Sequence, residues 1–208
     1  LALVSIRNIL SEEKKAECDA AIKETIAKLV SRQGSDGGFC YWPGGYTNDW
    51  ISSMAGEFLV RAKNVGFEVQ KDMLDNWSKF QKRRAGVFSE KTNVYLEDLE
   101  QAYRLYTLAL NSQTESGAMN RLKESQYTSP QAKWRLAAAY AIAGKKNIAK
   151  EIIADLQTEV AEYGETRLFG SASRDRAMYL QTLALSDELT KAMPLAEQVA
   201  AFVAENGY

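Results

Sequence analysis

The chain has 208 residues, with 26 lysines and arginines against 27 aspartates and glutamates, so its net charge is −1. That balance argues against a dedicated nucleic-acid-binding protein, which usually carries a basic face or stripe. The sequence contains no histidine, which excludes a Ser-His-Asp triad, a Cys-His pair, a zinc-protease helix and a histidine-ligated haem within these residues. Its two cysteines, Cys18 and Cys40, cannot complete a four-ligand zinc site by themselves. We therefore expect no metal and no cofactor.

Helical periodicity starts early in the chain. Apolar residues spaced by 4, 4 and 3 positions predict a helix over residues 11–31, and they are Cys18, Ile22, Ile26 and Leu29. A glycine-rich loop follows over residues 33–45. The remaining predicted helices cover residues 48–65, 70–84, 92–111, 115–125, 130–143, 146–160, 172–187 and 190–205. Sustained period-2 alternation is missing, so we expect almost no β-sheet.

Local signals fit several of these boundaries. Ser129 followed by Pro130 is a good N-cap with proline at the first helical position. Gly144 suits the position just after a helix end. Pro194 is expected near the start of the last helix, where a missing amide hydrogen costs little.

The predicted helices come in pairs, in which the first member is apolar nearly all round and the second carries one stripe. Residues 134–143 are of the first kind, and the stripe of the next helix consists of Ile148, Ala149, Ile152, Ile153 and Leu156. Helices that are apolar all round belong in an inner layer, and striped helices belong in an outer one. Two helical layers are typical of an α/α toroid or an α-solenoid. We predict an all-α fold, an α/α toroid of helical hairpins that forms an incomplete ring, as one domain over residues 1–208.

More specific motifs run in order through nearly the whole chain. They are residues 36–45 (DGGFCYWPGG), 48–50 (NDW), 55–63 (AGEFLVRAK), 101–110 (QAYRLYTLAL), 117–122 (GAMNRL), 132–140 (AKWRLAAAY) and 174–178 (RDRAM). In order and spacing they resemble motifs of bacterial alpha-2-macroglobulins, most of all the variant found in Bacteroidetes. The resemblance implies the thioester-containing, complement-like domain of such proteins, which is an α/α toroid.

The same resemblance implies a function and a location. Proteins of this family are large, usually periplasmic or cell-envelope proteins, often lipid-anchored, and they trap proteases that cleave a bait region. The implied partners are the other domains of the parent chain and, through the parent, target proteases. Neither nucleic acid nor a membrane surface is an implied partner of this segment, and no apolar run approaches the roughly 20 residues of a membrane span.

The chain departs from the family pattern at both cysteines. Many members carry a Cys-x-Glu-Gln motif that forms an internal thioester, whereas Cys18 is followed by Asp19 and Cys40 by Tyr41. In the family, that motif lies upstream of the region matched here. The chain begins with Leu1 rather than Met, and we interpret it as a piece of a longer protein that lacks the covalent chemistry. Catalytic and thioester residues are therefore expected to be absent.

Each candidate site residue has a structural and a functional interpretation. Cys18 lies on an apolar stripe, where a buried small hydrophobe is favoured over a disulfide with Cys40, which we also expect to pack. The carboxylates of Asp36, Asp49 and Glu57 are compatible with a glycosidase on a toroid. We favour structural roles, because Asp36 suits a turn and Asp49 the start of a helix.

Aromatic residues gather in the glycine-rich loop and just after it. The cluster of Phe39, Tyr41, Trp42, Tyr46 and Trp50 is interpreted as a tryptophan-anchored staple between neighbouring hairpins, with stacking on a sugar or a peptide as the alternative. The candidate loop and packing motif comprises Asp36, Phe39, Tyr41, Trp42, Asp49 and Trp50. The basic run at residues 79–84 is interpreted as a solvated helix end rather than a nucleic-acid patch.

Three classes of function fit these observations. The first is a non-enzymatic domain that supports a protease trap, or endopeptidase inhibitor, and the motifs favour it. The second is an enzyme on the same architecture, such as a glycosidase or a cyclase. The third is a scaffold that only binds other domains. A Cys-x-Glu-Gln motif before Leu1 would distinguish the first class from the third.

Overall fold

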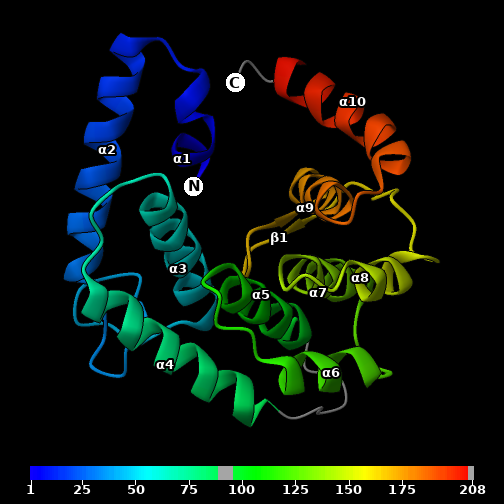
Figure 1. Cartoon of the computed structure of the whole chain (residues 1–208), viewed down its shortest axis with the longest axis horizontal. Helices are drawn as coiled ribbons and strands as arrows, with labels where there is room; N and C mark the ends of the chain where they lie inside the picture. The colour runs from blue at the N-terminus through cyan, green and yellow to red at the C-terminus, as the bar shows by residue number, and fades with distance from the viewer. Residues whose placement is uncertain (89–95, 206–208) are drawn as a thin grey trace. The chain divides into compact units, whose positions relative to one another are not determined.

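The computed structural model describes residues 1–88 and 96–205, and these residues form an all-α structure (Figure 1). Ten α-helices lie within those ranges, beside one 3-10 helix and one two-stranded sheet. The predicted all-α class is therefore confirmed. The chain divides into two compact units, Leu1–Val87 and Phe88–Tyr208. The assignment of residues 1–208 to a single domain stays a prediction.

The first unit holds the predicted helices in the predicted order. Its elements are α1 (Ala2–Ile6), the 3-10 helix η1 (Arg7–Ile9), α2 (Glu12–Val30), α3 (Asp49–Asn64) and α4 (Lys71–Val87). On α2, Cys18, Ile22 and Ile26 are buried as the stripe predicts, whereas Leu29 is half-buried. The fourth helix runs to Val87, beyond the predicted end at residue 84.

Close contact between α3 and α4 depends on a glycine. A Cβ atom at Gly56 would lie 2.0 Å from Cε2 of Trp77, so only glycine lets the indole ring approach the α3 backbone at this point. Trp77 is fully buried, and its Nε1 donates a hydrogen bond to the Ser52 carbonyl oxygen at 2.7 Å. A buried indole with its N–H satisfied contributes packing without a desolvation penalty.

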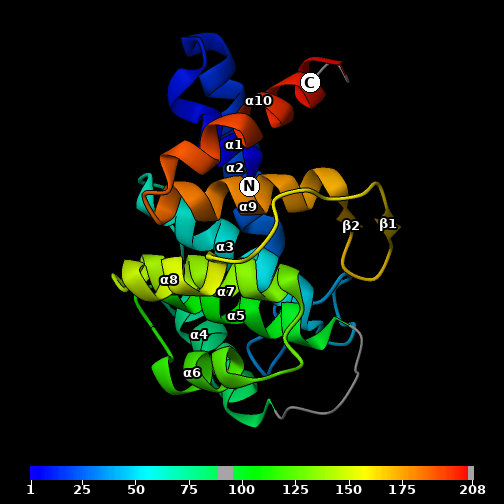
Figure 2. The ribbon, with the colours of Figure 1, turned by 90° about the vertical axis from the view of Figure 1, so that its right-hand side faces the viewer.

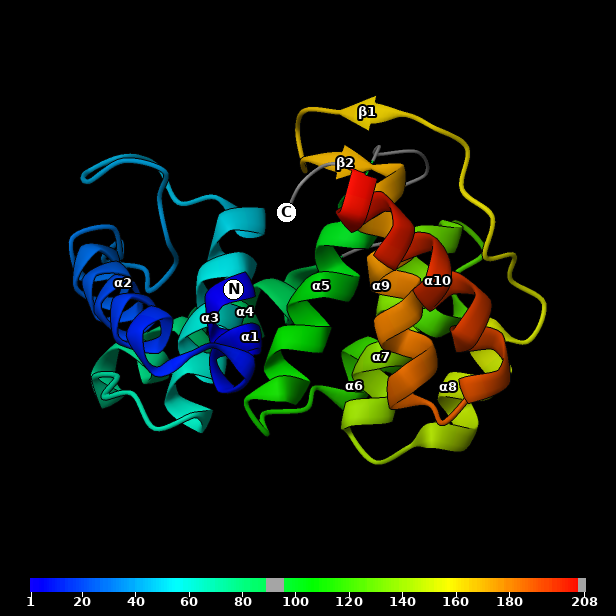
Figure 3. The same cartoon turned by 90° about the horizontal axis from the view of Figure 1, so that it is seen from above.

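The second unit consists of helical hairpins and one small β-hairpin. Its elements are α5 (Glu97–Leu110), α6 (Ser116–Glu124), α7 (Pro130–Ile142), α8 (Lys146–Ile153), β1 (Gly164–Glu165), β2 (Gly170–Ser171), α9 (Ala172–Leu185) and α10 (Leu189–Glu205). Helices α5, α7 and α9 pack in series, and each contacts the helix that follows it in sequence. Figure 2 shows α5 beside α7, and Figure 3 shows α10 running along α9. Helices α5 and α7 are buried along most of their length, whereas α6 and α8 each bury only a few residues. The inner and outer layers of a toroid stay a prediction.

Helices α7 and α8 owe their positions to apolar surfaces and local caps. On α7, Leu136 and Tyr140 are fully buried, and Ile153 of α8 faces the same core. Ser129 caps α7, since its side chain accepts a hydrogen bond from the Ala132 amide at 3.3 Å, and Pro130 occupies the first helical position. After the helix end, Gly144 adopts the predicted left-handed conformation with φ of +78°.

One predicted helix end and one predicted proline position are wrong. The helix expected over residues 146–160 ends at Ile153, and within the segment that follows, the Val160 carbonyl oxygen accepts a hydrogen bond from Arg176 of α9. Pro194 is inside α10, five residues beyond its start at Leu189, where a missing amide hydrogen removes an ordinary helical bond. The first part of the predicted helix over residues 92–111 lies outside the described residues, and α5 begins at Glu97.

Candidate functional site

The glycine-rich loop between α2 and α3 is fixed by its own polar side chains. Asp36 Oδ1 accepts hydrogen bonds from the Gly38 amide at 3.1 Å and from the Thr47 hydroxyl at 2.9 Å. Gln33 Nε2 donates to the Met73 carbonyl oxygen of α4 at 2.9 Å. Side chains that replace regular backbone pairing in this way hold an irregular loop in one conformation.

A close backbone approach explains one of the loop glycines. Gly37 has a φ of +93°, and a Cβ atom there would lie 2.3 Å from the Asn76 carbonyl oxygen of α4. The next aromatic residue, Phe39, is fully buried, and its amide donates to the Ser52 hydroxyl at 2.7 Å. The loop therefore lies directly against α3 and α4 within the first unit.

The predicted aromatic staple holds for only part of the cluster. Phe39 and Trp50 are buried, as expected, but Tyr41 is 38% exposed, Trp42 is 74% exposed and Tyr46 is 99% exposed. The Gly45 amide donates a hydrogen bond to the Trp42 carbonyl oxygen at 3.0 Å and closes a turn. This turn lies beyond the isolated β-bridge between Cys40 and Thr47. Side chains at its tip consequently project into solvent, which corrects the packing interpretation for Trp42 and Tyr46.

The candidate carboxylates each have a structural partner. Asp49 opens α3 and accepts hydrogen bonds from Arg84 Nε at 3.0 Å and Nη2 at 2.5 Å. Glu57 pairs with Arg61 on the next turn of α3 at 2.9 Å. Together with the turn formed by Asp36, these contacts favour the structural interpretation over the glycosidase one.

Both cysteines are buried and free. The thiol of Cys18 donates to the Leu3 carbonyl oxygen at 3.4 Å, and that of Cys40 donates to the Gly45 carbonyl oxygen at 3.0 Å. The disulfide that the sequence left as an alternative is therefore not formed. Their burial fits the packing role.

The basic run at residues 79–84 lies on the last turns of α4. Lys79, Arg83 and Arg84 are exposed, and Arg84 is the partner of Asp49. Arg83 also lies over the ring of Phe80, with 5.6 Å between its Cζ atom and the ring centroid. These contacts agree with a solvated helix end in which some cations pair locally.

A polar cluster at the start of α9 was not predicted as such, although the sequence singled out its motif. The carboxylate of Asp175 is fully buried, and it accepts hydrogen bonds from Arg174 Nη2 at 2.7 Å and from the Tyr163 hydroxyl at 2.7 Å. Arg174 Nη1 donates to the Leu168 carbonyl oxygen at 3.0 Å, and Arg176 Nη2 donates to that of Val160 at 2.8 Å. We call Tyr163, Arg174, Asp175 and Arg176 the α9 clasp.

The α9 clasp shifts the ionisation of its tyrosine. Burial and the hydrogen bond to Asp175 raise the pKa of Tyr163 to about 12. Burial also raises the pKa of the neighbouring Tyr179. Both phenols are therefore neutral at physiological pH.

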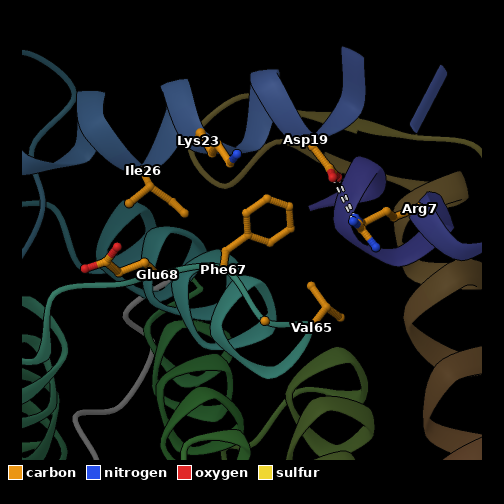
Figure 4. A pocket seen from close by; sticks show the side chains of 8 residues that line it. Arg7, Asp19, Lys23, Ile26, Val65, Phe67 and Glu68 are labelled. Carbon is orange, nitrogen blue, oxygen red and sulfur yellow. Dashed lines mark hydrogen bonds and ion pairs between the residues drawn. The ribbon is translucent and has the colours of Figure 1, made fainter. Parts of the chain in front are cut away.

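A separate cavity of about 520 Å³ lies in the first unit, between η1, α2 and the residues after α3 (Figure 4). It is lined by Arg7, Asp19, Lys23, Ile26, Val65, Gly66, Phe67 and Glu68. We call it the Arg7 cavity. Its volume falls in the range of small-molecule sites.

An ion pair fixes one wall of the Arg7 cavity. Arg7 donates from Nε to Asp19 Oδ1 at 2.5 Å and from Nη2 to Oδ2 at 2.7 Å. The guanidinium also lies over the Phe67 ring, with 5.6 Å between Cζ and the centroid. The hydrogen bonds from Arg7 hold the pKa of Asp19 below its ordinary value. No sequence pattern predicts this pair, because its members are 12 residues apart and belong to no motif.

The described residues contain neither a candidate metal cluster nor a helix that could span a membrane. Within residues 1–88 and 96–205, histidine, cysteine, aspartate and glutamate side chains form no group of three or more that could hold a metal ion. Across the same part of the chain, each helix is too short or too polar to cross a membrane.

Comparison with known proteins gives structural matches alone. No protein-family model matches the chain, and no curated protein sequence matches it. Solved structures of bacterial alpha-2-macroglobulins do match, with 21–23% sequence identity. At such identities the likeness shows the fold.

Three of these structures illustrate the match. Escherichia coli alpha-2-macroglobulin activated by porcine elastase is 22% identical, with a TM-score of 0.74 over 96% of this chain and 18% of that one. The native E. coli protein from domain MG7 to the C-terminus is 22% identical, with a TM-score of 0.71 over 90% of this chain and 31% of that one. Salmonella alpha-2-macroglobulin reacted with methylamine is 21% identical, with a TM-score of 0.72 over 92% of this chain and 14% of that one. The chain thus spans less than a third of these structures and shares its fold with a helical part of bacterial alpha-2-macroglobulins.

Proposed function

We propose that this chain is the helical, complement-like domain of an alpha-2-macroglobulin-like, protease-trapping protein. The observation that carries the proposal is the fold match over 96% of the chain to E. coli alpha-2-macroglobulin activated by porcine elastase. The ordered motifs from residue 36 to residue 178 point to the same family. In this proposal the helical hairpins belong to an α/α toroid whose ring is incomplete in these residues.

In this proposal the domain is a support and not a catalyst. Neither Cys18 nor Cys40 begins a Cys-x-Glu-Gln motif, and both thiols are buried. Asp36, Asp49 and Glu57 are engaged in a turn and in ion pairs. Acyl transfer also gains from a neighbouring base, and the commonest one is missing from the sequence.

The proposed partners and location follow from the family. The domain would contact other domains of its parent chain, and the parent would bind target proteases in the periplasm or cell envelope of a bacterium of the Bacteroidetes type. A lipid anchor would be carried elsewhere in the parent. Nucleic acid and membrane are not proposed as partners of this segment.

The first experiment uses the 208-residue chain by itself. Intact-mass spectrometry after incubation with methylamine should show no adduct, and the chain should not inhibit trypsin or elastase at equimolar concentration. An adduct, or stoichiometric inhibition, would place the covalent or trapping chemistry within these residues and contradict the supporting role.

The second experiment uses the full-length product of the parent gene. After exposure to trypsin it should retain the protease in a complex that survives gel filtration, and its sequence before Leu1 should show whether a Cys-x-Glu-Gln motif is present. If the parent neither retains nor inhibits any protease, a scaffold or an enzyme is favoured, and hydrolysis of a glycoside substrate would identify the latter.

A further inference from the structure

The Arg7 cavity has one cation held in an ion pair and a second cation that acts on the same carboxylate only from a distance. Arg7 donates hydrogen bonds to Asp19 from its Nε and Nη2 atoms. Its third nitrogen, Nη1, has no hydrogen-bond partner among the described residues. Lys23, one turn after Asp19 on α2, is exposed and forms no ion pair within the described part of the chain. Figure 4 shows Lys23 and the Arg7–Asp19 pair on either side of the Phe67 ring. Both donors therefore border the same cavity.

The rest of the cavity is apolar, with one acidic edge. Ile26 is buried, Phe67 is half-buried and Val65 is exposed, and these three side chains supply the apolar part of the lining. Glu68 lies at the opposite end of the cavity from Arg7 (Figure 4). With Asp19 it balances the two cations, so the lining carries no net charge. This arrangement favours a ligand with one negative charge over a multiply charged phosphate.

We propose that the Arg7 cavity binds a carboxylate attached to an apolar group. The carboxylate would accept hydrogen bonds from Lys23 Nζ and Arg7 Nη1, and the apolar group would cover the Phe67 ring. Charge-assisted hydrogen bonds of this kind are about twice as strong as neutral ones, and Arg7 needs little reorganisation because Asp19 and Phe67 already hold it. Two sources supply this chemistry: a free carboxylic acid, or the C-terminal residue of a peptide.

The test is titration of the 208-residue chain with N-acetyl-phenylalanine, in which calorimetry and amide NMR chemical shifts measure the binding. We expect saturable binding with a dissociation constant of about 1 mM or tighter, and shifts concentrated at Phe67 and Glu68. The matched ligand N-acetyl-phenylalaninamide, which lacks the carboxylate, should bind at least about tenfold more weakly. Equal binding of acid and amide, or no binding of either, would overturn the proposal.

Variants connect the binding to the cavity. Lys23→Gln should weaken the acid about tenfold, whereas Lys63→Gln, which removes an exposed charge outside the lining, should change affinity less than about twofold. Phe67→Leu keeps an apolar side chain and should weaken binding by removing the ring face, and a cooperative thermal unfolding transition would verify that this variant folds. If Lys23→Gln binds as the parent does, the carboxylate lies elsewhere and the proposal is wrong.

A peptide ligand distinguishes a free carboxylic acid from the C-terminal residue of a peptide as the natural ligand. A pentapeptide that ends in phenylalanine with a free C-terminus should bind more tightly than N-acetyl-phenylalanine if chain ends are the natural ligand. If the acetylated amino acid binds and the pentapeptide does not, the ligand is a free acid, and the assignment of the site still holds. None of these results depends on protease trapping, so a failure here leaves the proposed function standing.

Discussion

Two irregular segments of the chain are held in different ways. The loop at residues 33–47 is fixed within itself, by the turn at Asp36, by glycines and by a hydrogen bond from Gln33 to α4. The segment at residues 154–171 is fixed from outside, by arginine side chains of α9 that hold its carbonyl oxygens. The first segment depends on many small local contacts, and the second depends on a few strong polar ones. Substitutions should therefore affect them unequally.

The largest effect is expected at the α9 clasp. Asp175→Ala would remove the carboxylate that pairs with the mostly buried Arg174 guanidinium. It would also remove the acceptor of the Tyr163 hydroxyl. Removing one member of a buried ion pair costs about 3–5 kcal/mol. We expect a loss of this size in urea unfolding, with faster amide hydrogen exchange at Glu165 and Gly170. Asp175→Asn, which keeps an acceptor, is the matched control and should lose less.

A loss below about 0.5 kcal/mol for Asp175→Ala, the size of an ordinary surface change, would show that the clasp is not what holds the segment. Faster exchange confined to the two strands, with little global loss, would instead show that the clasp stabilises the β-hairpin alone.

The loop should be most sensitive where its backbone meets α4. Gly37→Ala would place a Cβ atom 2.3 Å from the Asn76 carbonyl oxygen at a φ of +93°. Strain and the forced shift of backbone should cost about 2–3 kcal/mol in chemical denaturation. Gly66→Ala is the control, because its φ of +98° is similar but nothing lies within 4 Å of its Cβ position. If both substitutions cost the same, backbone strain alone determines the effect and the contact with α4 adds nothing.

The contrast between the two segments also explains what could be predicted from sequence. The loop at residues 33–47 was predictable, because glycine, proline and aspartate select turns through local chemistry. The helix expected over residues 146–160 ends at Ile153, and a competing hydrogen bond to the Val160 carbonyl oxygen comes from Arg176, 16 residues further along the chain. Helical propensity is a weak prior that such tertiary hydrogen bonds override.

The exposure of individual side chains and the Arg7 cavity were harder to predict from the sequence than the loop and the helices. The aromatic motif predicted a cluster, but whether Trp42 packs or projects depends on where the turn tip falls relative to α3, which composition does not reveal. The Arg7 cavity joins η1, α2 and the residues after α3, and no spacing rule links such distant positions. The burial of α5 and α7 was predictable, by contrast, because a surface that is apolar all round has one stable location.

Tyr163 offers a pH test of the clasp. Tyr163→Phe removes the hydrogen bond donated to Asp175 and the one accepted from Arg174 Nη2. It should cost about 1–2 kcal/mol at pH 7, toward the lower end because the side chain is partly exposed. The pKa of Tyr163 is raised to about 12 in the folded chain, against 10.0 for an ordinary tyrosine. The unfolded chain therefore ionises first, and stability is lost as pH rises from 10 towards 12.

The measurement is urea unfolding of parent and variant between pH 7 and pH 12. The parent should lose stability more steeply than Tyr163→Phe above pH 10, so the difference between them should shrink there. If the two proteins keep a constant difference over this window, the phenol does not titrate differently in the folded state.

The turn at Asp36 should give a smaller effect. Asp36→Ala removes the acceptor of the Gly38 amide and the Thr47 hydroxyl, at a cost of about 1 kcal/mol. Asp36→Asn retains a side-chain oxygen in the same place and should cost less than half as much. Equal losses for asparagine and alanine would mean that the charge of Asp36, and not its hydrogen-bond geometry, stabilises the loop.

The smallest effect is expected at the loop tip. Trp42 is 74% exposed, so Trp42→Ala removes few contacts and should change the free energy of unfolding by less than about 0.5 kcal/mol. Phe39→Ala, three residues earlier in the same loop, deletes a fully buried ring and should cost about 3–5 kcal/mol. Parallel urea titrations of the two variants compare the exposed and buried parts of one aromatic motif. A loss above about 1 kcal/mol for Trp42→Ala would show that the indole packs in solution, as the sequence first suggested, and that the tip is less open than the structure has it.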